Sequence, residues 1–370
     1  MTFAGLSKSP IDRNALFSPC MVGAISVANR IVMAPMTRAR AGGDGVHTSI
    51  AVDYYRQRAS AGLIITESTN ISNQGRAEAF TPGIYTNRHV AAWREVTHAV
   101  HEAGGRIVMQ LRHAGRFSHN SLQEQGRAPV APSAIRAQGE LYIERGFATP
   151  SIPRALEERE IPKVIADFLS AALNARSAGF DGVEIHAANS YLLEQFLRDS
   201  TNHRMDKYGG SIENRARLTI EVTKAVSAAF GCGRVGVRLS PITTAVGYTP
   251  LDSTPHETYG YLAEQLGKLK LAYLHCIEGQ TRGTNAAKGF DFQMLRKLFG
   301  GRYIANNGYT YCMASGAIAN GSADLVAFGR AYIANPDLVE RFRRELPLSE
   351  ATREEFYGRG AGGYTDWQCL

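Results

Sequence analysis

Three polar residues that lie close together in the chain, His186, Asn189 and Tyr191, could act on a carbonyl or nitro oxygen. His186 ends an apolar run, and Asn189 follows three positions later on the turn into a helical pattern. At this spacing the two side chains can direct two hydrogen-bond donors at one oxygen and stabilise negative charge on it. Tyr191 could supply a proton from a different direction. The alternative is that His186 is a buried, hydrogen-bonded core histidine and Tyr191 a packing aromatic.

Eight short apolar runs, separated by longer helical patterns, could position these residues. The runs are rich in Val, Ile and Leu without strict alternation, which is typical of parallel strands buried on both faces. They cover residues 30–36, 62–68, 106–113, 182–187, 234–240, 271–279, 302–308 and 325–330. Helical patterns cover residues 51–59, 89–102, 162–178, 215–230 and 256–269, and their alternation with the strands favours βα units.

Eight such units predict an α/β fold of the closed (β/α)8 TIM-barrel type, with residues 1–370 forming a single domain. An open, doubly wound sheet is the alternative, but no G-x-G-x-x-G follows the first strand. Residues 114–162 interrupt the alternation after the third strand, and we expect them to form a capping loop or hairpin insertion. The glycine-rich, aromatic segment 347–370 is expected to pack over the barrel.

Composition excludes several other classes of protein. The 370 residues include 41 Lys and Arg and 34 Asp and Glu, for a net charge of +7, yet no block of like charge suggests nucleic-acid binding. No apolar run has the length of a signal peptide or a membrane span. Five widely spaced cysteines without a C-x-x-C pair indicate a reducing compartment and no structural zinc. We therefore expect a cytoplasmic protein that binds small molecules, without metal.

In a TIM barrel the active site is built at the carboxyl ends of the strands. Polar residues fall at these ends throughout the predicted barrel, which favours a functional use because buried polar groups need partners. Gly308, Gly329 and Arg330 follow the seventh and eighth strands, where this fold often binds phosphate. The alternative for each glycine is an ordinary turn.

Several motifs resemble the Old Yellow Enzyme family, also described as NADH:flavin oxidoreductases or ene-reductases. The resemblance runs in order over nearly the whole chain and is carried by residues 28–38, 59–69, 104–111, 180–218, 234–241, 323–338 and 356–366. It implies noncovalent FMN at the mouth of the barrel, reduced by NADPH or NADH, in a protein that is either a monomer or a homodimer. Thr37, where another subclass has cysteine, implies the threonine-containing subclass.

The resemblance also implies a role for each matching position. His186 and Asn189 would bind the electron-withdrawing group of an activated alkene, Tyr191 would donate a proton, and Tyr357 would line the pocket. The FMN-binding positions would be Ala34, Pro35, Met36, Thr37, Ser68, Gln110, His186, Arg238, Asn307, Gly308, Gly329 and Arg330.

The implied reaction reduces α,β-unsaturated aldehydes, ketones, imides or nitroalkenes, with hydride delivered to the β-carbon. The alternatives are a reductase of nitroesters or nitroaromatics, a flavin-dependent isomerase, and a flavin-binding module without turnover. The presence of Tyr191 argues against the isomerase, since relatives with that activity lack the tyrosine. The intact set of His186, Asn189 and Tyr191 argues against the module.

Two positions depart from the pattern of the family. Arg112 replaces a tryptophan that is common in the third-strand motif, and Glu78 stands where relatives often have a tyrosine. A lone arginine facing an apolar pocket would be costly to desolvate. One hypothesis is that Arg112 and Glu78 form an ion pair near the substrate, both contributing to the substrate-binding site. The alternative is that Arg112 turns outward to solvent.

Overall fold

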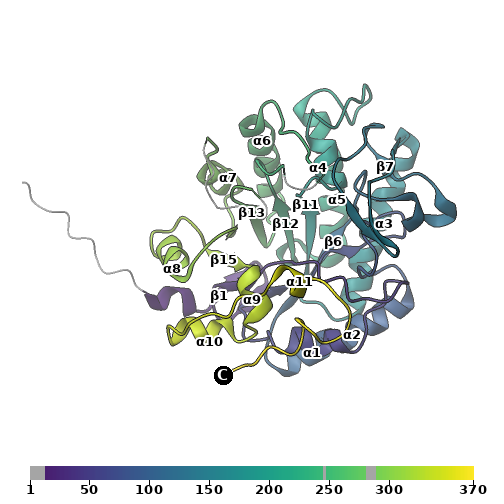
Figure 1. Ribbon diagram of the computed structural model, residues 1–370. Coiled ribbons are helices and arrows are strands. Elements are labelled where there is room, and N and C mark those ends of the chain that lie inside the picture. Colours follow the sequence, from purple (N-terminus) through teal and green to yellow (C-terminus); the bar gives the residue numbers. More distant parts are fainter. Residues whose placement is uncertain (1–12, 245–246, 281–288) are drawn as a thin grey trace, which may run out of the picture.

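A closed sheet of eight parallel strands forms the centre of the protein, seen in a computed structural model that describes residues 13–244, 247–280 and 289–370 (Figure 1). Each strand pairs with the next along the chain, and β15 pairs with β3 to complete the ring. The strands are β3 (Ile31–Met33), β4 (Leu63–Ile65), β6 (Ile107–Arg112), β11 (Gly182–Ala187), β12 (Val235–Leu239), β13 (Tyr273–Ile277), β14 (Tyr303–Asn306) and β15 (Leu325–Phe328). The predicted TIM barrel is confirmed.

Helices surround this barrel, and all five of the helical segments expected from the sequence are present. The helices are α1 (Ile50–Arg56), α2 (Asn87–Glu102), α3 (Ile161–Ser177), α4 (Leu192–Leu197), α5 (Ile212–Phe230), α6 (Pro255–Gly267), α7 (Phe292–Phe299), α8 (Tyr311–Ala319), α9 (Arg330–Ala334), α10 (Leu338–Arg343) and α11 (Arg353–Phe356). The sequence pattern did not reveal α7 and α8, which have only 8 and 9 residues. In the described part of the chain, no helix is long and apolar enough to cross a membrane.

The interior of the barrel is apolar at one end and polar at the other. The hairpin of β1 (Cys20–Val22) and β2 (Ile25–Val27) contributes Val22 and Ile25 to a buried cluster with inward-facing side chains such as Leu63. The backbone N–H of Ala24, in the turn of this hairpin, donates to the carbonyl of Gly233, just before β12. The hairpin therefore closes the amino-terminal end, and polar side chains are left to the carboxyl-terminal end.

Residues 114–162 contain four short strands. Strands β8 (Leu141–Ile143) and β9 (Gly146–Ala148) form an antiparallel hairpin, while β7 (Val130–Ala131) pairs in parallel with β10 (Arg154–Ala155). Apolar side chains of this insertion, including Phe117 and Leu141, are buried in one cluster with Tyr191. The insertion thus packs directly against a residue at the carboxyl end of the barrel.

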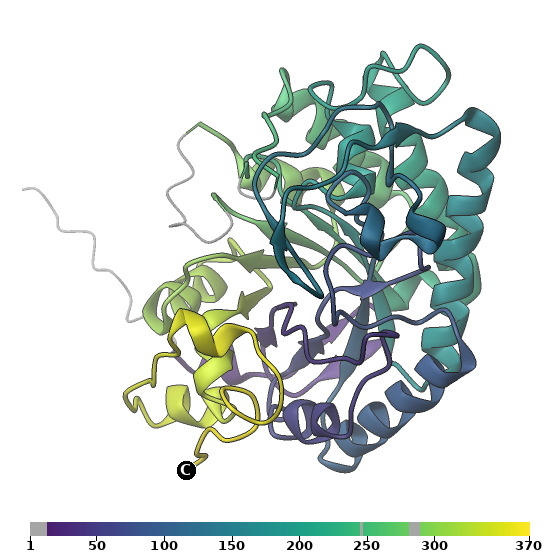
Figure 2. The same ribbon diagram turned by 45° about the vertical axis from the view of Figure 1, so that its right-hand side comes forward.

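The C-terminal segment lies against α1 and the loop that follows β3, as the yellow ribbon in Figure 2 shows. The ring of Tyr364 stacks on that of Tyr54 with 3.9 Å between centroids. Arg38 donates to the carbonyls of Phe356 and Gly363. These contacts hold the segment beside the carboxyl end of the first barrel strand.

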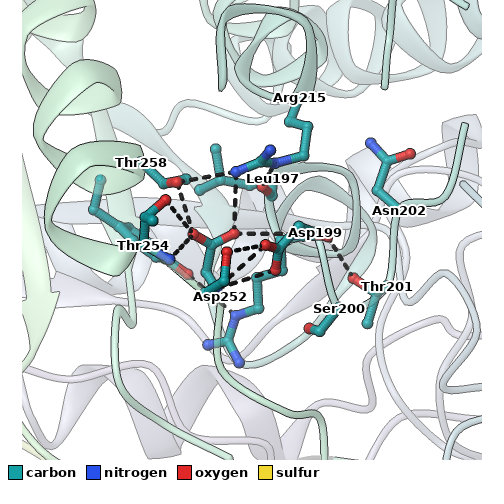
Figure 3. Close-up of polar contacts among 12 residues, drawn as sticks. Leu197, Asp199, Ser200, Thr201, Asn202, Arg215, Asp252, Thr254 and Thr258 are labelled. Carbon is teal, nitrogen blue, oxygen red and sulfur yellow. Dashed lines mark hydrogen bonds and ion pairs between the residues drawn. The ribbon is translucent and has the colours of Figure 1, made fainter. Parts of the chain in front are cut away.

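The loop after α4 is fixed by Arg215 on α5, a buried residue whose three guanidinium nitrogens all have partners (Figure 3). Nε donates to the carbonyl of Leu197 at 2.8 Å, and Nη1 donates to that of Gly210 at 2.7 Å. Nη2 donates to the Asp252 carboxylate at 3.3 Å and to the Thr258 hydroxyl at 3.1 Å. This saturated network anchors the far end of the segment that begins with His186.

Candidate active site

Five inward-facing polar side chains from neighbouring strands form two hydrogen-bonded groups in one layer near the carboxyl end of the barrel. The amide of Gln110 donates to the Glu184 carboxylate at 2.7 Å, and His275 Nδ1 lies 2.8 Å from the other oxygen of that carboxylate. Arg238 Nη2 donates to Asn306 Oδ1 at 2.7 Å. These hydrogen bonds fix the orientation of the Gln110 and Arg238 side chains.

The charges in this layer balance. Burial alone would raise the pKa of Glu184, but His275, Arg238 and Gln110 outweigh it and hold the pKa below its ordinary value. Burial lowers the pKa of His275, so the imidazole is neutral and can donate its Nδ1–H to the carboxylate. Burial lowers the pKa of Arg238 to about 10, which still leaves a cation at neutral pH. A fixed negative charge at Glu184 therefore supports a fixed positive charge at Arg238.

His186 lies near the end of β11, and Asn189 and Tyr191 follow on the turn that leads into α4. Burial, with help from the cations Arg238 and Arg112, pushes the pKa of His186 well below its ordinary value, so its imidazole is neutral. The rings of His186 and Tyr191 meet edge to face with 5.1 Å between centroids. The structure thus brings a neutral imidazole and a phenol together at the carboxyl end of the barrel.

The backbone of this turn is strained and held in place. Asn189 and Ser190 both have left-handed φ angles, of 55° and 60°, which cost roughly 1–3 kcal/mol each for residues other than glycine. The N–H of Asn189 donates to Ser240 Oγ at 2.7 Å, and the N–H of Ser190 donates to the buried Glu194 carboxylate at 2.5 Å. Such strain persists where the surroundings over-determine it, and it fixes the direction in which Asn189 and Tyr191 leave the backbone.

The positions assigned to the flavin surround the same end of the barrel. Ala34 is buried, whereas Pro35, Met36 and Thr37 continue from β3 as a half-buried rim. The hydroxyl of Ser68 donates to Gln110 Oε1 at 2.5 Å. These residues lie beside the polar layer.

The glycine-containing loops after β14 and β15 lie at the mouth. Asn307 donates from its amide to the carbonyl of Glu278 at 2.8 Å, and Gly308, with φ 70°, is exposed. A Cβ on Gly329 would lie 3.5 Å from Met36 Sδ, so this loop adjoins the rim after β3. Arg330 is exposed at the start of α9.

The structure overturns both hypotheses for Arg112. No ion pair joins Arg112 to Glu78 among the described residues, so the pairing hypothesis is wrong. Arg112 is also 0% exposed, so it does not turn outward to solvent. Its Nη2 instead donates to Asn70 Oδ1 at 2.8 Å. The reason is that β5 (Thr69–Asn70) pairs with the end of β6 and places Asn70 directly opposite Arg112.

Two further predicted site residues, Tyr357 and Glu78, lie on other segments of the chain, and some residues of the site were missed. Tyr357 is 43% exposed in the C-terminal segment, and Glu78 is half-buried in the loop before Phe80. Sequence reasoning did not single out Glu184, His275 or Asn70. A charged or polar residue within an otherwise apolar strand was the available signal for Glu184 and His275. In the described part of the chain, no cluster of His, Cys, Asp or Glu is arranged to hold a metal ion.

Comparisons with known proteins show the family of this chain. The sequence profile of the NADH:flavin oxidoreductase / NADH oxidase family matches residues 15–349. The chain is 42% identical over 353 residues to putative 12-oxophytodienoate reductase 5 of Oryza sativa subsp. japonica, covering 94% of this chain and 92% of the relative. It is 40% identical to 12-oxophytodienoate reductase 2 of Arabidopsis thaliana, covering 96% of each chain.

Solved structures are similar over almost the whole chain. An Old Yellow Enzyme homologue from Zymomonas mobilis superposes with a TM-score of 0.92 at 43% identity, covering 96% of this chain and 100% of that one. Morphinone reductase in complex with tetrahydroNAD superposes with a TM-score of 0.90 at 45% identity, covering 96% and 98%. The fold and the site therefore define a TIM-barrel flavin oxidoreductase that uses NAD(P)H. The chain belongs to the Old Yellow Enzyme family of NADH:flavin oxidoreductases.

Proposed function

We propose that the protein is an FMN-dependent ene-reductase of the threonine-containing subclass. The observation that carries the proposal is the neutral, buried His186, which lies beside Tyr191 and is paired in register with the cationic Arg238 on β12. In the part of the chain that the structure describes, His186 Nδ1 and Arg238 Nε are buried without hydrogen-bond partners, and such groups are rarely left unpaired. A polar heterocycle that crosses these strand ends would provide partners, so the residues present fit FMN.

Each side of the site would hold a different part of the cofactor. Arg238 and Gln110 would contact the pyrimidine edge, and the fixed cation of Arg238 would stabilise negative charge there. Ala34, Pro35, Met36, Thr37 and Ser68 would line the ring system. Asn307, Gly308, Gly329 and Arg330 would hold the ribityl phosphate, because glycine loops allow close backbone approach and Arg330 supplies an exposed cation. Bound FMN supplies transfer of hydride from NADPH or NADH to the β-carbon of an activated alkene.

His186 and Asn189 would bind the oxygen of the substrate's electron-withdrawing group. A neutral imidazole retains one N–H donor, and the side-chain amide of asparagine provides two more. Two fixed donors, one near the end of β11 and one on the strained turn that follows, stabilise the negative charge that develops on this oxygen without reorganisation during the reaction. Substrates would be α,β-unsaturated aldehydes, ketones, imides and nitroalkenes.

Tyr191 would donate the proton to the α-carbon. The phenol is 8% exposed, between the ring of His186 and the insertion residue Phe117, whose centroid is 6.4 Å away. This position restricts access of bulk water and presents the hydroxyl beside the oxygen-binding pair. Hydride addition and proton addition would then occur at adjacent carbons.

The proposal is tested by the visible spectrum of the purified, FMN-loaded protein under anaerobic conditions. We expect NADPH to bleach the flavin band and 2-cyclohexenone to restore it. Bleaching without recovery with any of the four substrate classes would contradict the ene-reductase assignment. Absence of a flavin spectrum after reconstitution with FMN would contradict FMN binding itself.

A further inference from the structure

Arg112 is a fully buried guanidinium that is held from one side only. The amide nitrogen of Asn70 donates to Thr81 Oγ1 at 3.0 Å and to the carbonyl of Pro82 at 2.9 Å. These two bonds fix the amide so that Asn70 Oδ1 accepts from Arg112 Nη2. Asn70 therefore anchors the guanidinium in one place.

The remainder of the guanidinium lies beside Tyr191. Arg112 Cζ is 5.2 Å from the centroid of the Tyr191 ring. Arg112 Nε and Nη1 are buried and have no hydrogen-bond partner among the described residues. In the described ranges no carboxylate forms an ion pair with Arg112; burial raises the pKa of Glu67 to about 6, and Arg112 only partly opposes that rise. The positive charge is thus not cancelled by direct contact.

We propose that Arg112 is a positioning residue that stabilises the phenolate of Tyr191 formed when the phenol gives its proton to the substrate. This inference rests on the proposed function. In that step the O–H bond of Tyr191 breaks and its electron pair stays on the phenolate oxygen. The electron pair of the substrate carbanion forms the new C–H bond at the α-carbon. A proton from solvent later restores the phenol.

The physical basis is the attraction between opposite charges in a region from which water is excluded. An opposite charge within about 4–6 Å lowers the pKa of an acid by roughly 1–3 units, because it stabilises only the ionised form. A phenol with a lower pKa that is still protonated near neutral pH is a better general acid. Arg112 would thereby accelerate protonation without touching the substrate.

Charged or titratable neighbours face Tyr191 from three strands, and their roles differ. Arg112 comes from β6, His186 from β11 and Arg238 from β12, and Tyr191 interacts electrostatically with Arg238. His186 is neutral, so it adds no charge. Arg238 acts in the same direction as Arg112 and would remain in an Arg112 variant, so the effect of Arg112 should be partial.

A different role, binding of an anionic group on the substrate, is disfavoured by burial. Arg112 is 0% exposed, and Tyr191 and Asn70 lie against it. A carboxylate could reach the guanidinium only after these neighbours moved. Stabilisation of Tyr191 requires no such movement.

The test compares Arg112→Gln, which removes the charge, with Arg112→Lys, which keeps it, in the FMN-loaded protein. The first readout is the titration of Tyr191 by fluorine NMR after 3-fluorotyrosine labelling, with Tyr191→Phe to assign the resonance. We expect the pKa of Tyr191 to rise by about 1–3 units in Arg112→Gln and by less in Arg112→Lys. Arg112→Trp, which restores the residue common in the family, replaces the Gln variant if that one does not fold.

The second readout is the rate at which 2-cyclohexenone reoxidises the reduced protein as a function of pH. In Arg112→Gln the plateau should fall roughly tenfold, while the decline at alkaline pH moves to higher pH. A merely structural defect would lower the plateau without moving the decline.

An unchanged Tyr191 titration in a folded, uncharged variant would overturn the proposal. An unchanged titration with a rate loss confined to carboxylate-bearing alkenes would do the same and would identify Arg112 as a substrate-binding cation. If the wild-type protein does not reduce alkenes, the proposed function fails, yet the NMR titration still measures whether Arg112 acts on Tyr191.

Discussion

Arg215 and Arg112 are both buried arginines on the carboxyl side of the barrel, but their surroundings differ. Every guanidinium nitrogen of Arg215 has a partner, including the carboxylate of Asp252. Within residues 13–244, 247–280 and 289–370, Arg112 has one hydrogen-bond partner, the neutral Asn70, and two nitrogens without a partner. A saturated charge network holds the chain in place, whereas an unsaturated one retains capacity to interact with groups that change during a reaction.

The same contrast extends to the neighbours of each arginine. Around Arg215 the buried polar groups satisfy one another, as the dashed contacts in Figure 3 show. Around Arg112, three further buried nitrogens have no hydrogen-bond partner in the described segments: His186 Nδ1, His113 Nε2 and Arg238 Nε. The comparison implies that substitutions in the first region should cost stability, whereas those in the second should mainly cost chemistry.

The largest effect is expected from Tyr191→Phe. Loss of a positioned general acid should slow alkene reduction by about 10²–10⁴-fold. Reduction of the flavin by NADPH does not use this proton, so its rate should stay within about twofold of wild type in the same stopped-flow measurement. Equal loss in both half-reactions would mean that Tyr191 is not the proton donor.

A direct comparison of stability would break or support the distinction between the two arginines. Arg215→Gln leaves the Asp252 carboxylate buried without its cation and should lower the free energy of unfolding by about 3–5 kcal/mol. Arg112→Gln breaks one hydrogen bond but also removes an unpaired buried charge, so its cost should be about 1 kcal/mol or less. Urea denaturation of both variants measures the difference. Equal costs would remove the distinction.

A smaller effect is expected from pH acting on His113, which is buried beside Arg112. Burial and the charge of Arg112 lower its pKa to about 3 in the folded protein. Below about pH 6.5 this histidine binds a proton in the unfolded chain but not in the folded protein. Its contribution therefore lowers the free energy of unfolding by about 1.4 kcal/mol per pH unit and levels off near pH 3. Denaturant midpoints between pH 7 and pH 4 measure this slope.

The matched variant for that measurement is His113→Asn. The asparagine oxygen can still accept the Gly115 N–H that His113 Nδ1 accepts at 3.1 Å. It does not titrate, so its acid slope should be shallower by the contribution of one histidine. An identical slope in both proteins would show that His113 is protonated in the fold.

The smallest effect is expected from Glu78→Gln. Because Glu78 forms no ion pair with Arg112, its neutralisation should change the rate of 2-cyclohexenone reduction less than about twofold and leave the pH profile in place. A larger change would indicate that Glu78 reaches Arg112 in the working complex. It would then also weaken the contrast with Arg215.

Much of the fold could be predicted from the sequence, because buried parallel strands consist of continuous apolar runs and the chain contains eight such runs. Helix α7 could not, because its 8 residues, Phe292–Phe299, provide little more than two turns of periodicity. The proximity of His186 and Tyr191 could also be predicted, since residues five positions apart in the chain stay close together in any fold.

The hydrogen-bond partners on different strands of the barrel could not be predicted in the same way. Glu184 and His275 are 91 residues apart, and Gln110 is 74 residues from Glu184. Their meeting depends on strand register and on which face of each strand points inward. A shift of one residue in the register of a strand would turn its inward-facing side chains outward and change the residues that lie opposite them.

The strands, the order of the motifs and the positive charge at Arg112 can be read from the amino-acid sequence. The surroundings of that charge were set by the folded structure. It placed Asn70 on one side of the guanidinium and Tyr191 on the other, and it kept Glu78 out of ion-pair reach. The physical reason is that apolar periodicity is encoded locally, whereas the environment of a buried charge is set by segments that meet only when the barrel closes.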